Sequence, residues 1–101
     1  MFLWVDDVRL PPSGAQWAWA RSVDEAAWLI MNTEFKGYPF ELIDIDHDAG
    51  DYASNGGDYI KLLDWLEETN RNYPIRIHSM NVVGVQNMRA IIQRNQWKEI
   101  K

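Results

Sequence analysis

Short runs rich in apolar residues recur along the chain, and each is bounded by polar, proline or glycine positions. Runs of this length are typical of buried strands, because strands in globular proteins are short and lie between turn-forming residues. The pattern predicts strands over Phe2–Val5, Trp17–Ala20 and Phe40–Ile45, and a short strand with Ile75 and Ile77 that ends at His78. A further run, Trp97–Ile100, predicts a last strand at one edge of the sheet.

Between these runs, apolar residues recur at three- and four-residue spacing, which is the period of one helix face. Ser22, followed three positions later by Glu25, has the spacing of a capping box and marks where the first helix begins. The pattern predicts helices over Val23–Met31, Asp58–Asn70 and Val83–Arg94, and loops over Leu10–Gly14 and residues 49–57. Strands that alternate with helices favour an α/β domain whose parallel sheet is covered on both faces.

The length of the chain suits one domain, so residues 1–101 are expected to share a single core. There is no cysteine, which excludes a disulfide framework and a zinc site built on thiolates. No apolar run approaches the roughly 20 residues that span a bilayer. The first residues also lack the basic and small-residue pattern of a signal peptide. We therefore expect a cytoplasmic location and no membrane partner.

The charge of the chain limits its partners. Ten lysines and arginines stand against fifteen aspartates and glutamates, for a net charge of −5. Proteins that bind long nucleic acids gain affinity from a basic face that releases phosphate counterions. Long duplex nucleic acid is therefore not an expected partner. A small phosphorylated nucleotide or a single RNA terminus is compatible with this charge if a metal or a few local cations offset it.

Polar residues follow three of the predicted strands. They are Asp6-Asp7, Asp46-His47-Asp48 and His78-Ser79-Met80-Asn81. In open parallel sheets, ligands bind outside the carboxyl ends of the strands, so these three segments are expected to converge. Carboxylates repel one another unless a hard cation lies among them, and Mg²⁺ prefers oxygen ligands. Asp6, Asp7 and Asp46 are therefore candidate ligands of Mg²⁺ or a similar divalent cation; the alternative is that Asp6 and Asp7 only end a strand.

Both histidines of the chain, His47 and His78, lie in these strand-end segments. Imidazole titrates near neutral pH, so either ring can transfer a proton during phosphate-ester chemistry. Ser79 and Asn81 are candidates to hydrogen-bond phosphate oxygens. Asn87 and Arg89 on the following helix are further candidates to bind substrate, although a solvated helix face explains Arg89 equally simply.

The same motifs resemble the cyclic-phosphate processing receiver domain family over nearly the whole chain. The resemblance rests on Leu3-Trp4-Val5-Asp6-Asp7-x-Arg9-x-Pro11, Asp46-His47-Asp48-x-Gly50, Gly57-Asp58-Tyr59 and His78-Ser79-Met80-Asn81-x-x-Gly84-x-x-Asn87-Met88-Arg89. It implies a flavodoxin-like, three-layer receiver fold with a parallel sheet of about five strands in the order 2-1-3-4-5, without the first receiver helix. It also implies that Asp6, Asp7 and Asp46 stand where receivers hold Mg²⁺ and accept phosphate.

The resemblance further implies the processing of 2′,3′-cyclic phosphate ends of RNA, or of related nucleotides, in RNA repair. The working hypothesis is a metal-assisted phosphoesterase of cyclic-phosphodiesterase type. In it, His78 is the first candidate for acid/base catalysis and His47 the second, Asp46 belongs to both the catalytic and the metal-binding group, and Arg9 complements the phosphate charge. Two alternatives stay open: a module that binds a cyclic nucleotide without catalysis, and a phosphoacceptor receiver that signals. No Lys-Pro pair follows the last predicted strand, as it does in signalling receivers.

Overall fold

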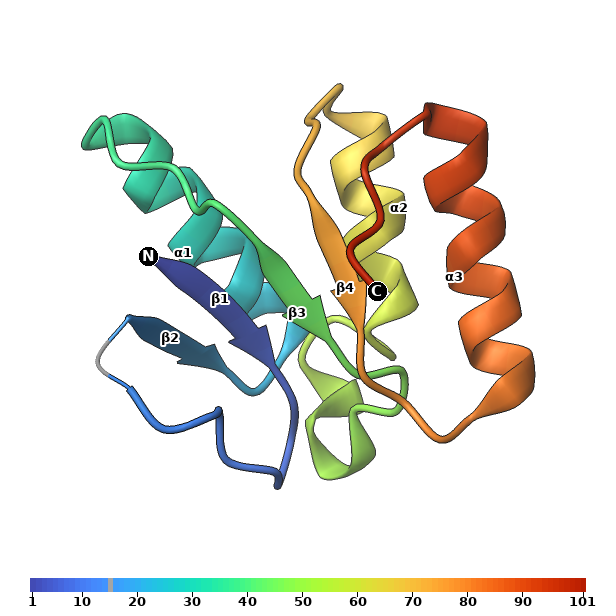
Figure 1. The fold of residues 1–101 in the computed structure, drawn as a ribbon. Helices are drawn as coiled ribbons and strands as arrows, with labels where there is room; N and C mark the ends of the chain where they lie inside the picture. Colours follow the sequence, from blue (N-terminus) through green and yellow to red (C-terminus); the bar gives the residue numbers. More distant parts are fainter. Residues whose placement is uncertain (15) are drawn as a thin grey trace.

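The computed structural model describes residues 1–14 and 16–101. Its elements follow in the order β1 (Phe2–Val5), β2 (Trp17–Ala20), α1 (Val23–Phe35), β3 (Ile43–Ile45), the 3₁₀ helix η1 (Gly50–Ser54), α2 (Ile60–Glu68), β4 (Ile75–Ile77) and α3 (Val82–Asn95) (Figure 1). The strands form one parallel sheet in the order β2-β1-β3-β4. In the described part of the chain, no helix has the length and apolar character needed to cross a membrane.

Helix α1 begins where local hydrogen bonds replace the missing backbone partners of a helix start. The hydroxyl of Ser22 accepts from the N–H of Glu25, and the Glu25 carboxylate reaches back to the N–H of Arg21. Helix α1 continues past the predicted end at Met31 to Phe35. Its last turn gains support from distant segments, since Arg71 and Tyr73 both hydrogen-bond Glu34 within that turn.

Alternate residues of the strands define the two faces of the sheet. Leu3 pairs with Ala18 and Ile43, and Ile43 with Ile75, so these four residues lie on one face. That face belongs to a single core to which all three α-helices contribute buried side chains. The helices therefore lie together on one side of the sheet; in Figure 1, α1 and α2 pass behind the strands and α3 lies to the right of β4.

The opposite face differs from the prediction of a sheet covered on both sides. It carries the register row Trp19–Trp4–Asp44–Arg76, and none of the described α-helices packs on it. The physical reason lies in the connection between β1 and β2, which steps toward the outer edge of the sheet without a helix. The third layer of a flavodoxin-like fold is therefore missing from the described residues.

The prediction of a last strand over Trp97–Ile100 was wrong, because this segment pairs with the sheet over a shorter length than a strand. Only a single parallel bridge forms, between Ile75 and Glu99. The N–H of Ile75 donates to Lys98, and the N–H of Ile100 donates to Ile75, so the segment pairs with one residue of β4 rather than along its length. The third strand is also shorter than predicted, because residues 40–42 lie outside the ladder.

Candidate functional site

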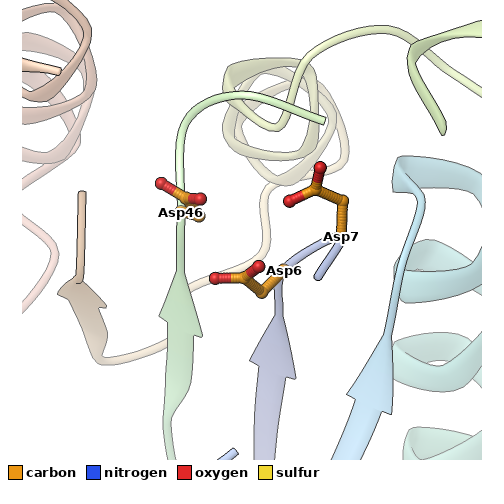
Figure 2. Close-up of side chains that lie close together, drawn as sticks. All are labelled: Asp6, Asp7 and Asp46. Atoms are coloured by element: carbon orange, nitrogen blue, oxygen red, sulfur yellow. The ribbon is translucent and has the colours of Figure 1, made fainter. Parts of the chain in front are cut away.

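The site lies at the carboxyl ends of β1 and β3, where two loops begin. Asp6 and Asp7 follow β1 and Asp46 follows β3, and Figure 2 shows their carboxylates gathered above the strand ends. One oxygen from each residue lies within 4.8 Å of the others. The predicted convergence of these strand ends on one place is confirmed.

Asp6 is held firmly in place. Its Oδ1 accepts hydrogen bonds from the backbone N–H groups of Val8 and Arg9, and its Oδ2 lies 2.9 Å from Nε2 of His78. Burial alone would raise the pKa of the Asp6 carboxyl, but the hydrogen bonds from Arg9, His78 and Val8 outweigh it and lower the pKa below its ordinary value. Asp6 is therefore a fixed carboxylate at the base of the cluster.

Asp7 has the opposite electrostatic environment. Burial, together with the nearby charge of Asp6, raises the pKa of the Asp7 carboxyl. Its Oδ2 lies against Gly50, where an added Cβ would come within 2.4 Å of that oxygen. Gly50 has a φ of +56°, in the left-handed region that favours glycine. The turn that begins η1 therefore leaves just enough room for the Asp7 carboxylate.

His78 is enclosed between two buried carboxylates. Its Nδ1 lies 2.6 Å from Oδ1 of Asp44 and its Nε2 lies 2.9 Å from Oδ2 of Asp6. The ring stacks on Trp4, with centroids 3.8 Å apart and an interplanar angle of 3°. A carboxylate only accepts hydrogen bonds, so both contacts are satisfied when both ring nitrogens carry a proton. His78 thus joins two buried carboxylates and has neither nitrogen directed at open space.

His47 is about as enclosed as His78, with 15% of its side chain exposed against 12%, but it meets a carboxylate on one nitrogen only. Its Nδ1 lies 2.7 Å from Oδ1 of the exposed Asp48 and 3.4 Å from Nδ2 of Asn81. Among the described residues, none hydrogen-bonds its Nε2. The ring lies against Gly84 on α3, where a Cβ would come within 2.4 Å of Cδ2. Asp48 and Gly84 together fix the orientation of this imidazole.

The other predicted residues of the strand-end loops also lie near the cluster. Asn81 caps α3 by accepting from the N–H of Gly84, and the hydroxyl of Ser79 accepts from the N–H of Asn81. Arg9 is exposed and joins the site through its backbone, which donates to Asp6. The structure therefore brings Ser79, Asn81 and Arg9 to the same edge of the sheet.

The two candidates on α3 are placed differently. Asn87 is exposed beyond the first turn of the helix. Arg89 forms an ion pair with Glu99, at 2.8 Å, and Glu99 is bridged to Ile75 at the beginning of β4. Because His78 follows the other end of that strand, the guanidinium of Arg89 is engaged away from the acidic cluster.

The geometry is accompanied by a match to a known family. The sequence profile described as the cyclic-phosphate processing receiver domain matches residues 1–94. The chain belongs to this family. The predicted resemblance is confirmed, and the parallel sheet with strand order 2-1-3-4 and three helices agrees with a receiver-like α/β fold. No curated protein and no solved structure matches the chain.

Several contributors to the site of this receiver domain were missed from the sequence. Asp44 in β3 is buried, and nothing in the sequence indicated that its carboxylate would meet Nδ1 of His78. Tyr59 donates a hydrogen bond to the backbone oxygen of Arg21, so the end of β2 also borders the site. Arg21 comes directly after a predicted strand, which was the available signal.

The three aspartates of the receiver domain fit a divalent cation. Their ligand set consists of carboxylate oxygens, which suit Mg²⁺. Among the described residues, Asp46 uses one oxygen to accept from the N–H of His47, and burial together with the nearby charge of Asp6 raises the pKa of Asp7. Asp7 and Asp46 therefore retain free oxygens for a metal, with Asp6 fixed beneath them.

Proposed function

We propose that this receiver domain hydrolyses a cyclic phosphate, on an RNA 2′,3′-cyclic phosphate end or a free cyclic nucleotide, with the help of a divalent cation. The observation that carries the proposal is the meeting of an acidic cluster with an oriented imidazole at one sheet edge, in a chain of a family named for cyclic-phosphate processing. Neither a cluster of acids nor a histidine would suffice alone.

His47 is the residue that we assign to proton transfer, in preference to His78. Opening the ring requires water to attack phosphorus, the bond to one ribose oxygen to break, that oxygen to gain a proton and the water to lose one. His47 offers Nε2 for this purpose while Asp48 holds Nδ1. His78 instead keeps Asp6 in position, because both of its nitrogens already face carboxylates.

Asp7 and Asp46 would hold the metal, with Asp6 as the third carboxylate. A bound divalent cation would neutralise phosphate charge and lower the pKa of a bound water. Asn81 and Ser79 stand at the beginning of α3, where side-chain groups and backbone N–H groups favour phosphate oxygens. Arg9 lies on the loop after β1 and adds a positive charge on the other side.

The proposal is tested by incubating the protein with Mg²⁺ and a panel of 2′,3′- and 3′,5′-cyclic nucleotides, and an RNA oligonucleotide with a 2′,3′-cyclic phosphate end. Products are separated by chromatography. We expect a phosphate monoester to form in the wild type. Asp46→Asn and His47→Ala should each lower turnover by about 10²-fold or more.

Glu68→Gln is the matched control, because it removes one negative charge from the exposed end of α2. It should leave turnover unchanged. Recovery of intact ligand from a complex that forms would instead support the non-catalytic binding module. Full activity in His47→Ala would show that this imidazole is not the acid/base.

A further inference from the structure

One arginine at the end of β2 has no assigned role. Arg21 follows β2 directly, and its guanidinium lies over the ring of Trp19, 4.1 Å from the centroid. Its Nη1 lies 3.4 Å from the hydroxyl of Tyr52 in η1. A planar guanidinium stacked on an aromatic ring has a restricted orientation while its remaining N–H groups stay available.

The contacts of Arg21 place it beside the acidic cluster. The indole N–H of Trp19 donates to the backbone oxygen of Asp6, at 2.8 Å. Tyr59 donates to the backbone oxygen of Arg21, at 2.7 Å. Burial, together with the charges of Asp7 and then of the other two aspartates, raises the pKa of Tyr59. Arg21 therefore borders the site from the side of β2.

The ion pairs of the other arginines make Arg21 distinctive. Four of the six arginines have a guanidinium nitrogen within 4.0 Å of a carboxylate, and these are Arg71, Arg76, Arg89 and Arg94. Among the described residues, Arg9 and Arg21 have no such partner, although the chain carries an excess of acids. Both follow a strand at the edge where the acidic cluster lies. A ligand anion would complete the charge balance there.

We propose that Arg21 binds the phosphate of the ligand, opposite the beginning of α3. This inference rests on the proposed function, because it assumes that a phosphate occupies the acidic site. A guanidinium pairs with phosphate oxygens through two parallel N–H groups, and such charge-assisted hydrogen bonds are among the strong ones. Arg21 offsets the repulsion between the phosphate and the three aspartates.

The test uses adenosine 3′-monophosphate, a product-like probe that a cyclic phosphodiesterase does not consume, and adenosine, which has the same base and ribose without phosphate. Affinities are measured by calorimetry with saturating Mg²⁺. Arg21→Ala should weaken the monophosphate by at least about tenfold. It should leave adenosine affinity, and Mg²⁺ affinity without nucleotide, undiminished. Arg21→Lys should restore part of the loss, since it keeps the charge without the fork.

Lys36→Ala is the matched control, because it removes one positive charge from the exposed opposite end of α1. It should change none of these affinities. An Arg21→Ala variant that binds the monophosphate as tightly as the wild type would overturn the role of Arg21 alone. Equal weakening of adenosine and its monophosphate would also overturn it, since the effect would not involve phosphate. A wild type that binds neither the monophosphate nor a 2′,3′-cyclic nucleotide would refute the proposed function as well.

Discussion

Replacement of His78 by alanine should destabilise the domain far more than the same change at His47. His78 lies between Asp6 and Asp44, which are 1% and 2% exposed. Without the imidazole, Asp44 loses its closest partner and Asp6 keeps only its backbone donors. The variant would thus retain two poorly neutralised charges at buried positions.

The expected loss in the free energy of unfolding is about 5 kcal/mol, the middle of the range that two contributions give together. Removing one partner of a buried ion pair costs about 3–5 kcal/mol. Loss of the stacked contact with Trp4 adds about 0.5–1.5 kcal/mol. Because small domains are stable by only about 5–15 kcal/mol, this is a large fraction of the total. His47→Ala breaks a pair whose aspartate is 64% exposed, and such pairs contribute about 0–1 kcal/mol.

Urea unfolding at pH 7, followed by tryptophan fluorescence, measures both variants. A double variant, His78→Leu with Asp44→Leu, removes one buried charge together with the imidazole ring. It should recover part of the free energy of unfolding that His78→Ala loses. A loss below about 1 kcal/mol in His78→Ala would refute the reasoning, because it would show that the imidazole does not neutralise buried carboxylates. An activity loss in His78→Ala should therefore be interpreted only alongside its stability.

Three other changes test the site. Without metal, Asp7→Asn should raise the free energy of unfolding by about 1 kcal/mol, because two charges within 4.8 Å in a water-like medium repel by about that much. The same change should abolish the rise in melting temperature that Mg²⁺ causes in the wild type, and a rise that persists would contradict the metal assignment. The lowered pKa of Asp6 stabilises the fold above the unfolded pKa of about 3.9, and this contribution is lost as pH falls through the folded pKa. Asp6→Asn should consequently lose less stability than the wild type in urea titrations between pH 5 and pH 2.5, and parallel losses would show that another acid dominates. Gly84→Ala should displace the ring of His47 and reduce turnover while Mg²⁺ affinity persists; unchanged turnover would separate His47 from catalysis.

Most of the fold could be predicted because its signals are local. β1 and β2 agree residue by residue with the apolar runs, and β4 ends one residue before the predicted end at His78. The extra turn of α1 depends on Arg71 and Tyr73, which lie far along the chain, so no local pattern contains it. The packing of all the described α-helices on one sheet face was likewise not visible, since alternation of strands and helices does not reveal on which side each helix packs.

Only part of the candidate site could be predicted from the sequence. The convergence of Asp6, Asp7 and Asp46 follows from strand ends in a parallel sheet, and this general rule was sufficient. The different environments of the two histidines could not be predicted. Whether a ring meets carboxylates on one nitrogen or on both depends on the register between β1, β3 and β4, which places Asp44 beside Trp4 and Arg76.

The absence of a side chain at Gly50 has a consequence for how this site can be lost during evolution. An alanine there would place its Cβ within 2.4 Å of the Asp7 carboxylate, while every aspartate and the net charge of the chain stayed the same. A descendant could therefore lose its site by a change at a residue that has no functional group. A sequence comparison based on the three aspartates alone would then class an inactive descendant as active. Including Gly50 in the comparison would avoid this error.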